Sequence, residues 1–230
     1  MATIGHTLKA FDEDLDQLRA LISQMGGFAE HAIRESMRCL IQRDLEGAQR
    51  VVANDKKLDA LDAETERRAV QLIALRAPMA DDLRDVVAAM KISGVVERIG
   101  DYAKNIAKRV PLLENVGAME PISLLPEMAK IATEMVHDVL NAFVERDAAA
   151  AIRVCERDRA VDDFYNSIFR ALLTFMMENP HNIGQSAHLL FVAKNIERIG
   201  DHATNIAEMV YYAASGQRMV ERTRGAAVED

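Results

Sequence analysis

The chain has 230 residues, half of them hydrophobic and only 5% aromatic, and its formal net charge is −8. An acidic chain without a Lys/Arg cluster is a poor candidate for nucleic-acid binding. No uncharged apolar run approaches the ~18 residues of a membrane span, and the N-terminal stretch MATIGHTLKAFDEDLDQL lacks the apolar core of a signal peptide. We therefore expect neither nucleic-acid binding nor membrane insertion.

Prolines and helix caps divide the chain into six expected helices. All five prolines lie in three places, at Pro78, within 111–126 and at Pro180, and proline interrupts helices. Asp44 and Asp147 each precede a run of helix formers and are typical N-caps. The sequence therefore predicts an all-α fold with helices at 7–42, 45–76, 81–110, 126–145, 148–178 and 184–214.

A segment near residue 100 recurs near residue 200. The stretches ERIGDYAKNIA (97–107) and ERIGDHATNIA (197–207) are identical at nine of eleven positions. Scattered identities at a shift of 103 residues, among them Asp44 with Asp147, extend the duplication toward the start of each copy. We therefore expect two tandem three-helix units, at 1–115 and 120–215, followed by a tail at 216–230.

The duplicated segment places two carboxylates one helical turn apart, roughly opposite an apolar stripe. Such a pair costs a helix a few tenths of a kcal/mol, and the glycine between its members costs about 1 kcal/mol more. A second pair, spaced as DxxxD, precedes each segment. Carboxylate oxygens are hard ligands that suit cations such as Mg²⁺ or Mn²⁺, although a solvated acidic face is the plainer alternative. The candidate metal ligands are Asp55, Asp59, Glu97 and Asp101 in the first unit and Asp158, Asp162, Glu197 and Asp201 in the second.

The spacing of these acids predicts their relative height. Two helices joined by a short turn at Pro78 run antiparallel, so residues equally distant from the turn lie level. Asp59 precedes Pro78 by 19 residues and Glu97 follows it by 19, while Asp55 and Asp101 are each 23 away. We expect these pairs to lie within about one helical turn of one another, and the same in the second unit around Pro180.

Other chemistry in the sequence is sparse. One ExxH motif, from Glu134 to His137, is present, but carboxylate-bundle metalloenzymes use two, and the matching positions of the first unit are His31 and Arg34. We find neither a Gly-rich phosphate loop nor a nucleophile with a base. No catalytic residue is therefore proposed, and three functions stay open: a non-enzymatic regulator, a carboxylate-bundle metalloenzyme and a metal-binding or purely structural helical adaptor.

The doubled motif resembles the PhoU family, the accessory regulators of bacterial phosphate-specific transport. ERIGDYAKNIA and ERIGDHATNIA carry the resemblance, and APMADDLRDVVAAMKIS and AHLLFVAKNIERIGDHATNIAE around them fit it as well. It extends over nearly the whole chain, from about residue 7 to 214. Valines precede Glu97 where the family commonly has an acidic or polar residue, so the motif adds no ligand there.

The resemblance implies a function as well as a fold. Family members are two tandem three-helix bundles, often dimeric, cytoplasmic and peripheral to the inner membrane through protein partners. They contact the phosphate transporter's ATPase subunit and a sensor histidine kinase, and they repress the phosphate-starvation response when phosphate is plentiful. Some bind iron or zinc clusters through E(D)xxxD motifs, which here match the eight acids above. The expected cofactor is therefore a metal ion, with iron, zinc, manganese and magnesium left open.

Overall fold

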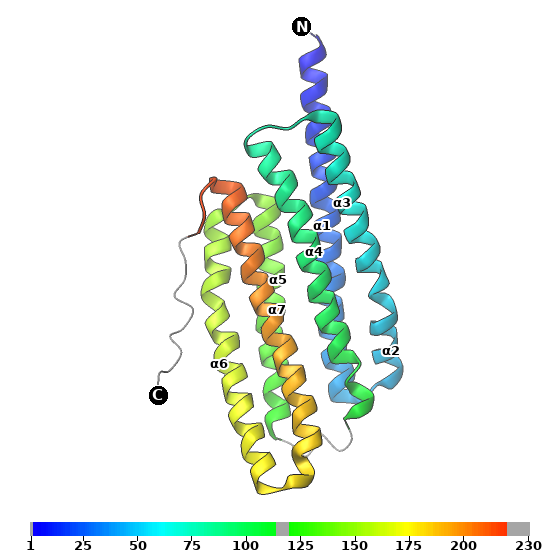
Figure 1. The fold of residues 1–230 in the computed structure, drawn as a ribbon, viewed down its shortest axis with the longest axis vertical. Coiled ribbons are helices and arrows are strands. Elements are labelled where there is room, and N and C mark those ends of the chain that lie inside the picture. The colour runs from blue at the N-terminus through cyan, green and yellow to red at the C-terminus, as the bar shows by residue number, and fades with distance from the viewer. Residues whose placement is uncertain (1, 114–119, 220–230) are drawn as a thin grey trace.

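The structure is a computed structural model and describes residues 2–113 and 120–219 (Figure 1). Within these ranges the regular elements are all helices. The long helices are α1 (Ala2–Gln42), α3 (Lys56–Arg76), α4 (Asp81–Ala107), α5 (Leu125–Glu145), α6 (Ala148–Glu178) and α7 (Ile183–Ser215), joined by the shorter α2 (Leu45–Asn54), η1 (Val110–Leu112), η3 (Glu120–Leu124) and η4 (Pro180–Asn182). The prediction of an all-α fold is confirmed.

The two expected N-caps are present and explain how the first helix of each unit turns into the second. Asp44 accepts a hydrogen bond from the Gly47 amide at 2.7 Å, and Asp147 accepts from the amides of Ala149 and Ala150. The residue before each cap, Arg43 or Arg146, has a φ of 55°. This left-handed residue reverses the chain, and the cap then satisfies amides that a helix start leaves without partners.

The expected helix at 45–76 is divided in two. The structure ends α2 at Asn54 and begins α3 at Lys56, with Asp55 between them. The Leu58 amide bonds to the Asp55 carbonyl at 2.8 Å, an i→i+3 contact that locally tightens the helix. The helix expected at 81–110 also ends earlier, because α4 stops at Ala107, ahead of Pro111.

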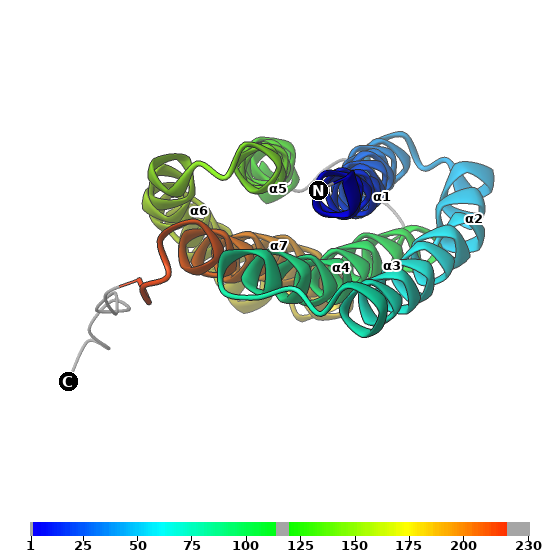
Figure 2. The same ribbon diagram turned by 90° about the horizontal axis from the view of Figure 1, so that it is seen from above.

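The helices form two side-by-side layers when they are seen end-on (Figure 2). One layer contains α6, α5, α1 and α2, and the other contains α7, α4 and α3. Helices α1–α4 pack on one another, as do α5–α7, and the two groups meet where α1 contacts α5 and α4 contacts α7. The expected boundary between the units and most of the expected tail lie outside the described residues.

The apolar stripe of the duplicated segment faces the core, as the periodicity predicts. Its members are buried in both copies, namely Ile92, Val96, Ile99, Ala103, Ile106, Val192, Ile196, Ile199, Ala203 and Ile206. Equivalent residues of the two copies also meet, because the Tyr102 hydroxyl lies 3.5 Å from Nε2 of His202 and their rings pack edge to face. Contact between equivalent positions relates the two units by an approximate two-fold rotation.

A buried carboxylate fastens the two groups of helices at one end. Asp85 of α4 is 3% exposed, accepts a hydrogen bond from Arg19 of α1 at 3.2 Å and forms an ion pair with Arg146, at the end of α5, at 3.1 Å. Burial raises the pKa of Asp85, although both arginines act against this. A buried charge of this kind requires its partners, so the three helices are held in one arrangement.

Candidate functional site

The first acidic site lies where α3 and α4 approach most closely. A Cβ built at Gly100 would lie 2.3 Å from Cδ1 of Leu58 and 3.6 Å from Oδ1 of Asp55. Close packing against the buried Leu58 side chain, and not backbone conformation, therefore favours glycine here. The approach places Asp55 directly beside the turn of α4 that carries Asp101, which confirms the expected height of this pair.

A lysine bridges the two carboxylates of this site. The ammonium of Lys104 donates to both Asp55 and Asp101. Burial opposes the charge of Lys104, but hydrogen bonds to Asp101 and Asp55 outweigh it and raise the lysine pKa. The Asp55 side chain is only 7% exposed, so this internal cation neutralises the buried carboxylate that the sequence assigned to a metal.

Glu97 lies one turn before Asp101, within the electrostatic influence of the other carboxylates of this site. Its pKa is raised by burial first, and then by the charges of Asp101 and Asp59, with smaller effects from neighbouring carboxylates. One turn further along, the Ser93 hydroxyl of α4 donates to Asp62 of α3 at 2.7 Å, so the two helices keep the register that equal distances from Pro78 predict. The site is therefore a group of acids on two helices with one lysine at one end.

The second acidic site has the same framework with a different arrangement of charge. A Cβ built at Gly200 would lie 3.4 Å from Oδ1 of Asp158 and from Cγ1 of Val161, which is ordinary contact. Position 204, equivalent to Lys104, is a threonine whose hydroxyl donates to the Asp201 carbonyl. The cation that bridges the carboxylates of the first site is thus missing from the matching position of the second.

Glu197 is the most enclosed acid of the second site. Lys194 donates to its Oε1 at 2.6 Å, while Oε2 is buried and has no hydrogen-bond partner among the residues that the structure describes. Burial is the main cause that raises the pKa of Glu197; Lys194 opposes it, and the charges of Asp201 and Asp162 add to it. Asp158 of α6 lies beside the turn of α7 that carries Asp201, because its Oδ1 would lie 3.4 Å from a Cβ at Gly200, and this agrees with the predicted height of the pair.

The eight predicted acids therefore form two groups of four, one between α3 and α4 and the other between α6 and α7. Among the residues that the structure describes, no three or more His, Cys, Asp or Glu side chains converge in a geometry that could hold a metal ion. The prediction that these acids bind metal stays a prediction. Sequence reasoning overlooked Lys104, although its position three residues after Asp101 on one helix face was a readable signal.

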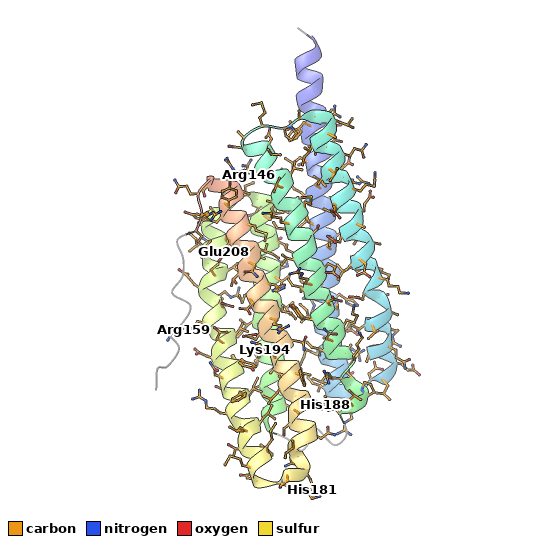
Figure 3. The ribbon with its side chains drawn as sticks, in the orientation of Figure 1. Arg146, Arg159, His181, His188, Lys194 and Glu208 are labelled. Atoms are coloured by element: carbon orange, nitrogen blue, oxygen red, sulfur yellow. The ribbon has the colours of Figure 1, made fainter. Side chains whose placement is uncertain are left out.

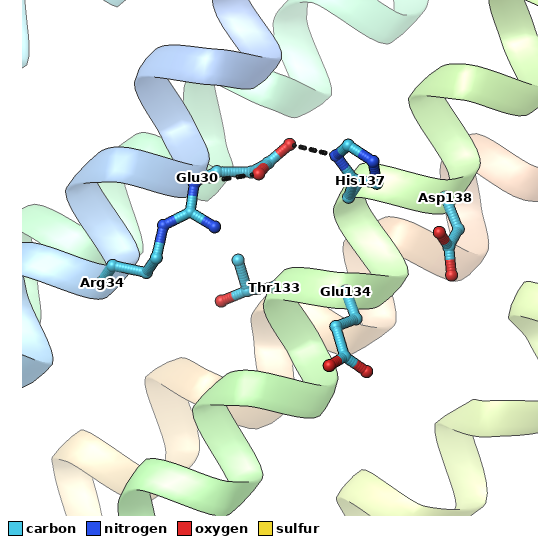
Figure 4. A pocket seen from close by; sticks show the side chains of 6 residues that line it. All are labelled: Glu30, Arg34, Thr133, Glu134, His137 and Asp138. Atoms are coloured by element: carbon cyan, nitrogen blue, oxygen red, sulfur yellow. Dashed lines mark hydrogen bonds and ion pairs between the residues drawn. The ribbon is translucent and has the colours of Figure 1, made fainter.

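The ExxH motif has other partners (Figure 4). Glu134 pairs with Arg157 at 2.6 Å, whereas His137 bonds through Nδ1 to Glu30 of α1 at 3.0 Å. Glu134 and His137 line a cavity of about 360 Å³ between α1 and α5, together with Glu30, Arg34, Thr133 and Asp138. The glutamate and histidine thus serve separate contacts, and of these two only His137 joins the two units at this interface.

The fold and its duplicated acidic segment define a class of protein: an all-helical molecule in which one helical unit occurs twice. The family model described as the PhoU domain matches residues 22–110 and 125–210. The chain belongs to the PhoU family.

Named relatives are similar along nearly the full length. The chain is 58% identical over 222 residues, 96% of its own length and 94% of the relative's, to a phosphate-specific transport system accessory protein PhoU homolog of Zymomonas mobilis. It is 47% identical to the homolog of Caulobacter vibrioides, over 94% and 95% of the two chains. The crystal structure of PhoU from Pseudomonas aeruginosa aligns with a TM-score of 0.85 at 33% identity, covering 90% of this chain and all of that one.

These relatives place the chain among accessory proteins of phosphate transport, which are not enzymes. The metalloenzyme alternative is thereby set aside. None of the helices in the described parts of the chain is both long and apolar enough to cross a bilayer.

Proposed function

We propose that this protein regulates phosphate uptake and represses the phosphate-starvation response when phosphate is plentiful. Its partners in this proposal are the ATPase subunit of the phosphate transporter and the phosphate sensor histidine kinase. The observation that carries the proposal is the match of both helical units to one family whose named relatives are accessory to phosphate-specific transport.

The proposed location is the cytoplasm, at the inner membrane, as a homodimer held there by protein partners. The net charge of −8 disfavours attachment to anionic lipid. The test incubates the purified protein separately with the transporter ATPase subunit, with the kinase's cytoplasmic part and with protein-free phosphatidylglycerol vesicles at physiological salt. We expect complexes with the two proteins and none with the vesicles. Binding to vesicles alone would contradict the proposal, as would the absence of both protein complexes.

We further propose that a metal cation binds in the second unit before the first. In the first unit Lys104 already bridges Asp55 and Asp101, whereas in the second Thr204 supplies no positive charge and Oε2 of Glu197 is buried without a hydrogen bond. A buried carboxylate oxygen without a partner suits a cation. Glu197 and Asp201 are the residues that would hold it, and the cation would supply charge neutralisation there.

Metal content of untagged protein tests this assignment. We expect Glu197→Gln to lose bound metal in elemental analysis, while the matched change Glu97→Gln in the first unit retains it. Loss only in Glu97→Gln, or protein free of metal after growth and purification without chelators, would refute the assignment.

A further inference from the structure

A basic pocket lies on the surface between the end of α4 and the first half of α7. Its volume is about 400 Å³, within the range of small-molecule sites. It is lined by Asn105, Lys108, Arg109, Leu112, Phe191, Lys194, Asn195 and Arg198. Four of these side chains are cationic, two are amides and none is acidic, although the protein as a whole carries a net charge of −8. Figure 3 shows Lys194 on this part of α7, with His188 toward its beginning.

The positive charge of the pocket is largely available to a ligand. Among the described residues, no carboxylate lies within ion-pair distance of Lys108, Arg109 or Arg198. Lys194 alone is paired, with Glu197 at 2.6 Å. Four cations and one neighbouring carboxylate leave an excess of about three positive charges in a concave surface, which concentrates the field on an anion.

An aromatic ring accompanies these charges. Phe191 is 54% exposed, and the guanidinium of Arg109 lies 4.5 Å from its ring centroid while bonding to Nδ1 of His188 at 3.1 Å. A large apolar side chain left this exposed beside fixed cations is a surface on which a flat ring can stack. The pocket therefore combines donors for anionic oxygens with a platform for an aromatic group.

The duplication supplies an internal comparison. The approximate two-fold rotation carries each pocket position to its counterpart 100 residues away. There Lys108 corresponds to Glu208, Arg109 to Met209 and Lys194 to Gly94. Figure 3 shows Glu208 nearer the other end of α7. Arg198 keeps a cationic counterpart in Arg98, and Phe191 corresponds to Lys91. Three of the four pocket cations nevertheless have no cationic counterpart, so the charge excess of the pocket is not a consequence of the helical framework that both units share.

We infer that this pocket binds a small molecule that carries two or more phosphate groups. The charge excess matches a di- or triphosphate, whose oxygens accept charge-assisted hydrogen bonds from Lys and Arg. A single orthophosphate would leave most of the volume unfilled. A nucleotide would in addition place its base beside Phe191, whereas inorganic pyrophosphate would use the cations alone. The inference rests on the pocket and does not depend on the proposed function.

Isothermal titration calorimetry of the full chain with pyrophosphate and with ATP tests the inference. Lys108→Glu installs the residue that the second unit carries at the matching position, so the framework should tolerate it. We expect it to weaken binding at least about tenfold, because reversing one charge near a phosphate changes the interaction by more than about 1 kcal/mol. Lys91→Glu, the same change on an exposed lysine of α4 outside the pocket, should leave affinity within about twofold.

A second matched pair protects the test against misfolding. Arg198→Ala should weaken binding, whereas Arg98→Ala, at the equivalent position outside the pocket, should not. Circular dichroism and thermal melting verify that all variants fold. Tighter binding of ATP than of pyrophosphate would assign the ring of Phe191 to a nucleotide base, and equal binding would assign recognition to the phosphates. The inference is overturned if neither probe binds, if the pocket variants bind like the wild type, or if a polyglutamate peptide competes as well as ATP.

Discussion

Replacing the glycine of each repeated segment by alanine tests the helix packing at the two acidic sites. Inside a helix, Gly→Ala is worth about 1 kcal/mol of stability in its own right. At Gly200 the new methyl group would lie 3.4 Å from Val161 and Asp158, so we expect nearly the full gain. For a chain of this size, that corresponds to a rise in Tm of about 2–4 °C.

The same change at Gly100 meets a different neighbour. The new methyl would lie 2.3 Å from Cδ1 of Leu58, whose side chain is 2% exposed. Forcing this packed side chain aside costs about 1–3 kcal/mol, which offsets or exceeds the helix gain. We expect Gly100→Ala to range from neutral to about 2 kcal/mol less stable.

Urea unfolding of both variants, followed by circular dichroism, measures the difference. In a Leu58→Ala background the obstacle is gone, and Gly100→Ala should recover its gain of about 1 kcal/mol. If Gly100→Ala stabilises the wild-type protein as much as Gly200→Ala does, the close approach of α3 and α4 described above is wrong.

Three further predictions concern charge, two of them at the first acidic site. Lys104→Thr should lower the free energy of unfolding by roughly 3 kcal/mol, because it leaves Asp55 buried and unpaired. Added Mn²⁺ should restore part of this loss. An unchanged urea midpoint would show that the lysine is dispensable. Glu97→Gln should stabilise chelator-treated protein at pH 7, because burial and neighbouring carboxylates raise the pKa of Glu97 in the folded state, and the gain should vanish in acid as the wild-type carboxyl becomes protonated. Glu64→Gln should do the opposite, because hydrogen bonds from Arg67 and Arg68 lower the pKa of Glu64 from 4.5 to about 2. This variant should be less stable than the wild type at pH 7, and its loss of stability should fade as the pH falls from 4.5 toward 2. Melting curves from pH 7 to pH 3 distinguish these signs, and a parallel response of the two variants would refute them.

Much of the fold follows from local sequence signals. Proline and the caps Asp44 and Asp147 limit helices through contacts within a few residues, so most of the predicted ends agree with the structure, with the end of α4 at Ala107 an exception. The break at Asp55 was not predicted, because nothing in its neighbours forbids a helix and the matching Asp158 lies within the unbroken α6. At this break the Asp55 carboxylate accepts a hydrogen bond from Lys104, which is 49 residues away in the sequence.

The sequence predicted which acids lie level on neighbouring helices, but not which cations neutralise them. Equal spacing from Pro78 and Pro180 determined which acids lie level, because the helices are antiparallel and straight enough to keep register. Which cation neutralises them depends on side-chain directions that spacing does not specify. The basic pocket was also missed, since Arg109 and Phe191 are 82 residues apart and meet only when α4 packs on α7. Comparing the two repeats for positions where charge differs, such as Lys108 and Glu208, would have indicated it.

Expression of phosphate-starvation genes in high phosphate, in a strain that lacks this protein, tests the proposed function most directly. Phosphate uptake is recorded in the same cultures, and a strain complemented with the wild-type chain is the control. We predict that the deletion leaves the starvation genes expressed or phosphate uptake unrestrained despite abundant phosphate, and that complementation restores control. Normal repression together with normal uptake in the deletion strain would contradict the proposed function.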